Sequence, residues 1–405
     1  MNILVINSGS SSIKYQLFKM PCTAPICSGL VERIGLQNSS VTHKVYSGDK
    51  ERAVTLTLNI PDHETGMIEI GKVLTEPGIG VIKNPEEIEV VGHRVVHGGE
   101  KFSQPAIITA QVKEEIKKLF SLAPLHNPGH YKGIEIAEKL FPKASHIAVF
   151  DTAFHQTMPE KAFRYAIPNS YYTDYHIRAY GFHGTSHKYV TAKTLKYLDK
   201  PDAKIITIHL GNGCSMAAVD AGKCIDTSMG LTPLDGLIMG TRCGNIDASV
   251  ILYLEQQEGY TAERVNAILN KESGMTGLTG HADMRDIQKL IADGDEAARL
   301  AYDMYAYRIK KFIGSYAAAL NGLDAVVFTA GVGENDSLAR ELACRNLDFF
   351  GIVLDGQKNN LRSPLLREIS TTESRVKVLV VPTNEELEIA TQCVELLSHS
   401  NKQGK

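Results

Sequence analysis

Short apolar runs that end in turns rich in glycine and serine recur along the chain. Residues 3–6 form the first such run, a polar turn follows at residues 8–11, and residues 13–18 form a second run. Short runs rich in β-branched residues and bounded by turn residues are typical of buried strands. The pattern therefore predicts a strand–turn–strand hairpin at the start of the chain.

The polar turn of this hairpin has two interpretations. In the first, the turn only reverses the direction of the chain. In the second, its backbone N–H groups and hydroxyls bind an anion together with Lys14 on the following strand. Patterns elsewhere in the chain distinguish between the two.

An internal duplication favours the anion-binding interpretation. The segments NILVINSGSSSIKYQLF (residues 2–18) and KIITIHLGNGCSMAAVD (residues 204–220) both run from a strand through a glycine-containing turn into another strand. A second pair, EIEVVGHRVVHGGE and DAVVFTAGVGENDS, repeats an apolar strand before a glycine turn. Helical patterns at residues 296–320 and 384–397 lie between or after these strands. The chain is therefore expected to form two similar α/β halves, whose paired turns hold a polyphosphate.

Length, composition and charge agree with this picture. A chain of 405 residues suggests two domains, and a net charge of −3 gives no reason to expect nucleic acid or an acidic membrane as partner. No apolar run reaches the roughly 18 residues of a transmembrane helix, and the start of the chain lacks the pattern of a signal peptide. The seven cysteines form no CxxC pair. They are expected to be reduced thiols of a cytoplasmic protein.

Longer motifs resemble those of the acetate kinase family. They occur in the family's order along the whole chain: NSGSSSIKYQLF, VGHRVVHGGE, FDTAFHQTMP, YGFHGTSHKYV, HLGNGCS, DTSMGLTPLDGLIMGTRCGNID, FTAGVGEND and PTNEELEIA. The resemblance implies an α/β fold of two similarly built domains. Each would have the duplicated ribonuclease-H-like core of the actin-like ATPases, with the active site in the interdomain cleft. It places domain I at residues 1–150 with the C-terminal helix 385–405 packing back onto it, and the nucleotide-binding domain II at residues 151–384.

The resemblance also implies the reaction. It is reversible, Mg²⁺-dependent, in-line transfer of the γ-phosphoryl group of ATP to acetate, which gives acetyl phosphate and ADP. Mn²⁺ is expected to substitute for Mg²⁺, and the family is usually homodimeric. The alternatives are a propionate or butyrate kinase of the same family and an acid-independent ATPase that acts as a conformational binding module. A sugar kinase is disfavoured because the expected pocket is apolar.

Two arginines stand in unusual surroundings for exposed charges. Arg94 follows an apolar strand and Arg242 lies in a loop with little other charge, and each has a glycine two residues away. Phosphoryl transfer requires charge stabilisation, for which the planar guanidinium group is suited. On residue type alone, a solvated surface arginine remains an alternative for each. The resemblance implies that matching arginines bind the carboxylate and the phosphoryl group in transit.

Asp151, His183 and His126 complete the expected catalytic set. Asp151 follows the apolar run HIAVF, at a strand end where ligands of α/β proteins gather, although it could instead cap a helix. Acetate is already ionised at neutral pH, so we expect Asp151 to orient an arginine or the metal shell rather than to act as a base. The resemblance implies that His183 hydrogen-bonds the phosphoryl group and that His126 lies near the substrate. On sequence alone, His183 could equally be a capping or core histidine.

The remaining site residues are expected mainly from the family match. Asn7 and Glu385 are the expected metal ligands, because Mg²⁺ prefers oxygen ligands. The family match favours Glu385 over the adjacent Glu386. The alternative is that a glutamate in the first turn of a helix only stabilises the helix dipole. The expected nucleotide-binding residues are Lys14, His209, Leu210, Gly211, Asn212, Gly213, Asp283, Met284, Arg285, Gly331, Val332, Gly333, Glu334 and Asn335. The expected substrate pocket consists of Arg94, Val96, Leu125, Phe182 and Pro233. Valine at position 96 leaves little room and favours acetate over longer acids.

Three HxxxH pairs raise the alternative of a zinc enzyme. They are His93 and His97, His126 and His130, and His183 and His187. The spacing converges on a metal only within a helix, and none of the pairs contains the glutamate of an HExxH motif. The first pair lies in or beside a predicted strand, and proline or glycine interrupts the others. The zinc interpretation is therefore disfavoured.

Overall fold

The structure, a computed structural model, describes residues 1–9, 11–48, 50–124 and 126–403. The chain forms two compact units, with unit 1 comprising Met1–Ala153 and Asn384–Lys405 and unit 2 comprising Phe154–Thr383. The sequence placed the boundaries at 150/151 and 384/385. In the structure, Asp151 belongs to unit 1.

Unit 1 is built on a mixed sheet. Its strands are β1 (Asn2–Ser8), β2 (Ser12–Lys19), β3 (Pro25–Glu32), β4 (Ser39–Ser47), β5 (Lys50–Leu58), β6 (Val90–Val95), β7 (Ala106–Ile107) and β8 (Ser145–Phe150). They lie in the order β5-β4-β3-β2-β1-β6-β8-β7. Strands β1 to β5 form an antiparallel meander, whereas β6 is parallel to β1 and to β8. The hairpin predicted from residues 3–6 and 13–18 corresponds to β1 and β2.

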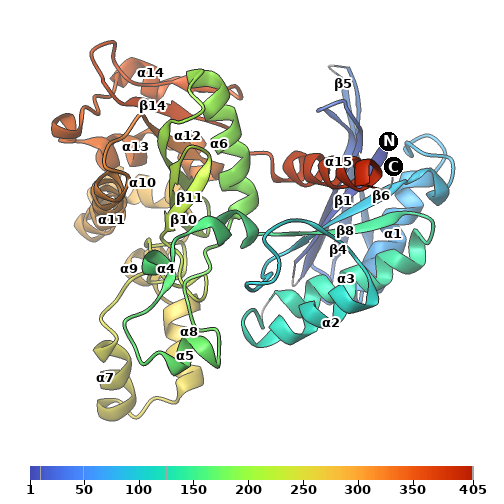
Figure 1. Cartoon of the computed structure of the whole chain (residues 1–405), viewed down its shortest axis with the longest axis horizontal. Coiled ribbons are helices and arrows are strands. Elements are labelled where there is room, and N and C mark those ends of the chain that lie inside the picture. Colours follow the sequence, from blue (N-terminus) through green and yellow to red (C-terminus); the bar gives the residue numbers. More distant parts are fainter. Residues whose placement is uncertain (10, 49, 125, 404–405) are drawn as a thin grey trace. The chain divides into compact units, whose positions relative to one another are not determined.

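Helices cover the sheet of unit 1. They are α1 (His63–Thr75), α2 (Ala110–Lys118), α3 (Asn127–Leu140) and α15 (Glu385–Gln403), with short 3₁₀ turns at Pro85–Glu87 and Leu119–Ser121. A third 3₁₀ turn, Ala153–Thr157, begins at the last residue of this segment of unit 1 and continues into unit 2. Apolar residues of α1 and α3 share one core with β1 and β2. Helix α15 packs against β1 and β6, next to which it lies in Figure 1. The contact is so close that a Cβ on Gly92 of β6 would lie 2.8 Å from Ile389 of α15.

Unit 2 contains a second mixed sheet. Its strands are β9 (Lys204–Leu210), β10 (Cys214–Asp220), β11 (Lys223–Thr227), β12 (Ala325–Thr329), β13 (Arg367–Glu368) and β14 (Lys377–Val380), in the order β11-β10-β9-β12-β14-β13. Strands β9, β10 and β12 are buried along almost their whole length. Near-continuous burial of this kind requires helices on both faces of a sheet.

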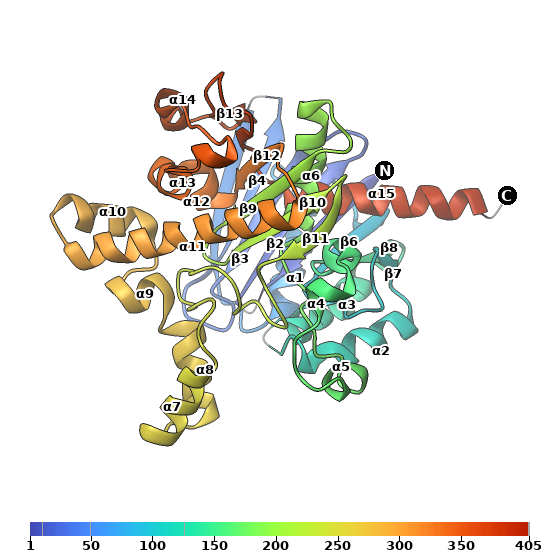
Figure 2. The same ribbon diagram turned by 60° about the vertical axis from the view of Figure 1, so that its left-hand side comes forward.

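The helices of unit 2 provide that cover. They are α4 (Glu160–Phe163), α5 (Ser170–Thr173), α6 (Gly184–Leu198), α7 (Ser249–Gln257), α8 (Ala262–Lys271), α9 (Gly274–Thr279), α10 (Met284–Ala292), α11 (Glu296–Leu320), α12 (Ala330–Asn335), α13 (Ser337–Cys344) and α14 (Gly356–Asn360), with a 3₁₀ turn at Asp348–Phe350. Helix α6 packs against β9 and β12, and α11 lies along β9 and β10 (Figure 2). Helix α11 begins where Asp295 accepts a hydrogen bond from Ala298 N, which is a standard N-cap.

The two sheets repeat one topology. In unit 1, β3-β2-β1 is an antiparallel meander, β6 and β8 continue parallel to β1, and β7 closes the edge antiparallel to β8. Strands β11-β10-β9, then β12 and β14, then β13, follow the same order and directions in unit 2. The duplication inferred from the two strand–turn pairs is therefore present in the sheets.

Two further properties concern the chain as a whole. Within the described residues, every helix is too short or too polar to cross a membrane. The cysteines are free thiols, and Cys27, Cys214, Cys224, Cys344 and Cys393 are buried.

Candidate active site

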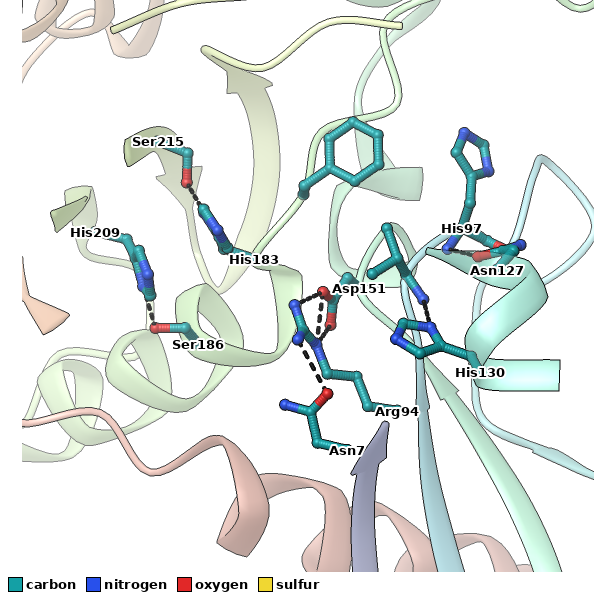
Figure 3. Close-up of polar contacts among 12 residues, drawn as sticks. Asn7, Arg94, His97, Asn127, His130, Asp151, His183, Ser186, His209 and Ser215 are labelled. Atoms are coloured by element: carbon teal, nitrogen blue, oxygen red, sulfur yellow. Dashed lines mark hydrogen bonds and ion pairs between the residues drawn. The ribbon is translucent and has the colours of Figure 1, made fainter. Parts of the chain in front are cut away.

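In unit 1, polar residues from three adjacent parallel strands meet at the carboxyl ends of those strands. Asn7 lies near the end of β1, Arg94 near the end of β6, and Asp151 directly after β8. Arg94 Nε lies 2.9 Å and Nη2 2.6 Å from Asp151 Oδ2, and Arg94 Nη1 donates to Asn7 Oδ1 at 3.3 Å. Figure 3 shows the guanidinium group between the two partners. The carboxyl ends of parallel strands are the usual ligand-binding edge of such sheets.

The carboxylate of Asp151 holds the guanidinium group of Arg94 in one orientation. The side chain of Asp151 is 1% exposed and that of Arg94 is 20% exposed. Burial disfavours the charged arginine, but the carboxylates of Asp151 and Glu385 outweigh burial and raise the pKa of Arg94. Arg94 is thus a fixed cation with part of its surface accessible to a ligand.

Glu385 lies in the same unit, at the first position of α15. Asn384 caps this helix by accepting a hydrogen bond from Leu387 N at 2.9 Å, whereas the hydroxyl of the preceding residue, Thr383, contacts Ser186. Burial raises the pKa of Glu385 to about 7, although Arg94 acts in the opposite direction. A nearby cation would favour the ionised form of this carboxylate. Carboxylate and amide oxygens fit Mg²⁺, which usually takes one or two carboxylates and completes its shell with substrate oxygens and water.

Other predicted residues of unit 1 lie along the same edge. Val96 follows β6, is buried, and donates its N–H to His130 Nδ1 at 3.2 Å. His126 immediately precedes α3, and its carbonyl accepts a hydrogen bond from His130 N. Lys14 is exposed on β2 opposite Asn7. Leu125 lies outside the described residues.

In unit 2, His183 occupies the turn that starts α6. Its φ of 54° is in the left-handed region, which is uncommon for a residue with a side chain. His183 Nδ1 lies 2.9 Å from Ser215 Oγ, and the imidazole stacks on that of His209 with ring centres 4.2 Å apart. Figure 3 shows both contacts. A strained backbone that its neighbours hold in place is typical of functional sites.

A glycine brings His183 next to Arg242. A Cβ on Gly213 would lie 3.4 Å from His183 Nε2 and 3.5 Å from Arg242 Nη1, so both side chains line this turn. Among the described residues, no carboxylate forms a salt bridge with Arg242, and burial lowers the pKa of its guanidinium group. Buried charges normally have a partner, so a cation without one indicates an anion site.

The two pocket residues expected from unit 2 lie around the same turn. Arg242 Nη1 is 3.5 Å from the carbonyl oxygen of Pro233. Phe182 immediately precedes His183, is buried, and accepts a hydrogen bond through its carbonyl oxygen from His155 Nε2.

A cavity of about 670 Å³ lies within unit 2. Of the residues expected to bind nucleotide, it is lined by Gly211, Asn212, Asp283, Met284, Arg285, Gly331, Val332 and Asn335. Asp283 also caps α10 and forms a salt bridge with Arg285. These residues come from three separate segments, and the fold brings them around one cavity.

Some expected nucleotide residues do not line this cavity. They are His209, Leu210, Gly213, Gly333 and Glu334 in unit 2, and Lys14 in unit 1. Glu334 instead accepts hydrogen bonds from Ala330 N and Thr383 N. Conversely, sequence reasoning missed the lining residues Ala282, Gln288, Asp336 and Arg362. Asp336 carries a detectable signal, since it precedes a helix whose first N–H groups it caps, but that signal indicates only a cap.

The histidine pairs do not form a zinc site. Within the described ranges, no group of three or more His, Cys, Asp or Glu side chains is arranged to hold a metal ion. His93 Nε2 instead pairs with His146 Nδ1 at 3.0 Å in the core of unit 1.

Comparison with known proteins identifies the family of the chain. The chain matches the Acetokinase family over residues 2–391. It is 57% identical to an acetate kinase of Flavobacterium johnsoniae over 98% of this chain and 100% of the relative. Its structure resembles that of Porphyromonas gingivalis acetate kinase with a TM-score of 0.92 and 45% identity, over 98% of this chain and 99% of that one. A propionate kinase from Francisella tularensis has a TM-score of 0.90 and 43% identity, over 96% and 98% of the two chains.

The matches extend over nearly the whole chain, and the fold is the one that the sequence resemblance implied. The relative at 57% identity is an acetate kinase, whereas the propionate kinase is 43% identical. The chain therefore belongs to the acetokinase family and has the activity of an acetate kinase, a phosphotransferase with a carboxyl group as acceptor.

Proposed function

We propose that the two units supply complementary halves of one reaction, the reversible in-line transfer of the ATP γ-phosphoryl group to acetate. Unit 1 supplies Arg94 at the carboxyl ends of β1, β6 and β8, and unit 2 supplies Arg242 and His183 beside the turn after β9. The observation that carries this proposal is the Arg94–Asp151 pair, because it presents a fixed and partly accessible cation to a small carboxylate. The edge of the sheet at the carboxyl ends of its parallel strands is where such ligands bind.

Acetate arrives ionised, so the acceptor needs orientation rather than deprotonation. Arg94 binds the acetate carboxylate through its planar fork. Asp151 keeps the fork in place by accepting from Nε and Nη2, which leaves Nη1 directed toward Asn7. His126 and Val96 lie on the neighbouring segments and line the acetate site.

The donor side must neutralise charge on the moving phosphoryl group. Arg242 and His183 meet at Gly213 and stabilise its equatorial oxygens, which is the largest protein contribution in reactions of this type. The cavity of unit 2 holds the nucleotide, and Gly211, Asn212 and Gly331 let it approach the backbone.

Asn7 and Glu385 would hold Mg²⁺, for which Mn²⁺ would substitute. Bound there, the ion would neutralise the negative charge of the ATP phosphate oxygens. The raised pKa of Glu385 supports this assignment, because a carboxylate in such surroundings is stabilised by a nearby cation.

Filling the cavity of unit 2 is expected to impair nucleotide binding alone. A Cβ on Gly331 would meet no heavy atom within 4 Å, so Gly331→Leu extends into open cavity space. We expect the KM for ATP to rise about tenfold, equivalent to ~1.4 kcal/mol, with thermal stability unchanged. Gly356→Leu is the control, because Gly356 is equally unobstructed but lies outside the cavity. Equal KM values for the two variants would show that the nucleotide binds elsewhere.

The proposed substrate is tested by trapping acyl phosphate as the hydroxamate with acetate, propionate, butyrate or no acceptor. We expect the highest kcat/KM with acetate. In Val96→Ala, the ratio of kcat/KM for acetate to kcat/KM for propionate should fall roughly tenfold, since one methylene is worth about 1–3 kcal/mol. Val91→Ala, the same change in the core of β6, which Val96 directly follows, should leave the preference unchanged. A preference for propionate or butyrate in the unmodified enzyme would refute the pocket assignment. ATP hydrolysis that does not depend on an added acid would favour the alternative of an ATPase that acts as a conformational binding module.

The remaining proposals concern the assembly and the compartment. We propose a homodimer, as expected from the family, which sedimentation analysis would test. Free and buried thiols support a reducing, cytoplasmic location.

A further inference from the structure

Four side chains of unit 2 form a hydrogen-bonded row that ends at His183. Thr207 Oγ1 lies 2.7 Å from His187 Nδ1, and His187 Nε2 lies 2.8 Å from Ser215 Oγ. The Ser215 hydroxyl then lies 2.9 Å from His183 Nδ1 (Figure 3). Thr207, His187 and Ser215 are fully buried, so water cannot replace these contacts.

The protons in this row can be ordered because each group has few of them. A hydroxyl has one proton, and a neutral imidazole carries one proton on one of its two nitrogens. The hydroxyl of Thr207 has two acceptors, His187 Nδ1 at 2.7 Å and the carbonyl oxygen of Ala217 at 3.5 Å. The second distance is at the limit for a hydrogen bond, so the proton belongs to the first contact.

This assignment determines which atom donates in the two remaining contacts, His187–Ser215 and Ser215–His183. His187 is buried and its pKa lies well below the ordinary value, so the ring is neutral. Since Nδ1 accepts from Thr207, the proton of His187 is on Nε2 and is donated to Ser215 Oγ. The hydroxyl of Ser215 must then donate to His183 Nδ1, and the proton of His183 resides on Nε2.

We propose that Thr207, His187 and Ser215 are positioning residues that hold His183 as the neutral tautomer protonated on Nε2. The ring then donates a hydrogen bond to a phosphoryl oxygen without first taking up a second proton. This inference rests on the role of His183 in the proposed function.

The charged and titratable groups of unit 2 around His183 favour the neutral ring. Arg242 lies across Gly213, His209 stacks on the imidazole, and His187 is reached through Ser215. His183 also occupies the N-cap position of α6, whose dipole opposes a positive charge there. A neighbouring arginine and a helix N-terminus both disfavour an imidazolium ion.

The tautomer can be observed directly by ¹⁵N NMR of the histidine side chains of the full chain. The signals of His183 are identified by their loss in His183→Gln. We expect a protonated Nε2 and an unprotonated Nδ1 from pH 8 to pH 6. A protonated Nδ1 at pH 7 would overturn the proposed order of protons.

Ser215→Ala removes the donor to Nδ1 and should change the titration of His183. A second proton on Nδ1 is then no longer opposed, so the pKa of His183 should be higher in this variant than in the unmodified protein. We also expect kcat to fall about tenfold, which is ~1.4 kcal/mol of transition-state stabilisation, with the KM for ATP unchanged. An unchanged titration of His183 in this variant would refute the role of Ser215.

Two further variants separate this role from general destabilisation. Ser228→Ala is the matched control. The Ser228 hydroxyl accepts a hydrogen bond from the backbone N–H of Met216, the neighbour of Ser215 on β10, and within the described residues it forms no hydrogen bond with a histidine. It should leave the titration of His183 unchanged. Thr207→Val should shift the titration in the same direction as Ser215→Ala, which keeps the test available if that variant does not fold. A changed titration with unchanged kcat would leave the proton order intact and overturn the role of His183 in phosphoryl transfer.

Discussion

Asp151→Asn is expected to lower kcat for acetyl phosphate formation by about 10²–10³-fold, the usual cost of losing one preorganised electrostatic group. Arg94 Nε and Nη2 both donate to Asp151 Oδ2, and Nε also donates to Oδ1 at 3.2 Å. The NH₂ group of asparagine must occupy one of these two oxygen positions and oppose an N–H donor there, and the amide carries no charge to pair with the guanidinium group. The guanidinium group then loses its fixed orientation toward the acceptor. The measurement is kcat and KM for acetate, together with urea unfolding, because breaking a buried ion pair costs roughly 3–5 kcal/mol.

The control for this variant is Glu138→Gln. It removes the salt bridge between Glu138 and Lys113, which joins α2 to α3 in the same unit, outside the proposed site. We expect its kcat to match that of the unmodified enzyme. Near-normal turnover of a correctly folded Asp151→Asn variant would contradict a role for Asp151 in orienting either Arg94 or the metal shell.

The second large effect is expected for Arg242→Ala. A guanidinium group that stabilises a phosphoryl group in transit contributes about 10³–10⁵ in rate, so we expect a loss of at least three orders of magnitude in kcat. Because no carboxylate of the described chain pairs with Arg242, its removal leaves no buried charge behind. Stability should therefore be retained, in contrast to Asp151→Asn.

Two further variants sharpen this test. Arg242→Lys keeps the charge but loses the planar fork, and should recover only part of the rate. Arg264→Ala, which removes an exposed arginine paired with Glu272 in the same unit, should behave as the unmodified enzyme. Arg242→Ala with a kcat within tenfold of normal would exclude Arg242 from charge stabilisation.

The repeated strand–turn units were predictable from the sequence because they depend on local patterns. Alternation of apolar residues and turns identified the β1–β2 and β9–β10 hairpins, and the helical pattern at residues 296–320 coincides with α11. Strands β4 and β5 extend the sheet of unit 1 without a counterpart in unit 2, and the duplication therefore gave no indication of them. The chain's family was identifiable because its motifs are long and occur in order.

Side-chain contacts between distant segments were not predictable. The contacts of Ser215 with His183 and His187 depend on how α6 packs on the sheet, and Arg362 reaches the cavity from a loop without a recognisable motif. The cap of α15 is Asn384 and not the adjacent Thr383; both residue types are good caps, and only the geometry distinguishes them. The positions of Arg94 and Asp151 were accessible because both follow apolar strands.

The return of α15 to unit 1 has a consequence for biosynthesis. Strands β1 and β6 emerge from the ribosome early, but α15, which covers them, emerges only after the whole of unit 2. Domains generally fold as units during translation. Unit 2 can thus fold on the nascent chain while the sheet of unit 1 still exposes apolar surface to chaperones. Because Glu385 arrives with the same helix, the proposed metal site and the finished sheet appear together, and a chain stalled before this point has neither.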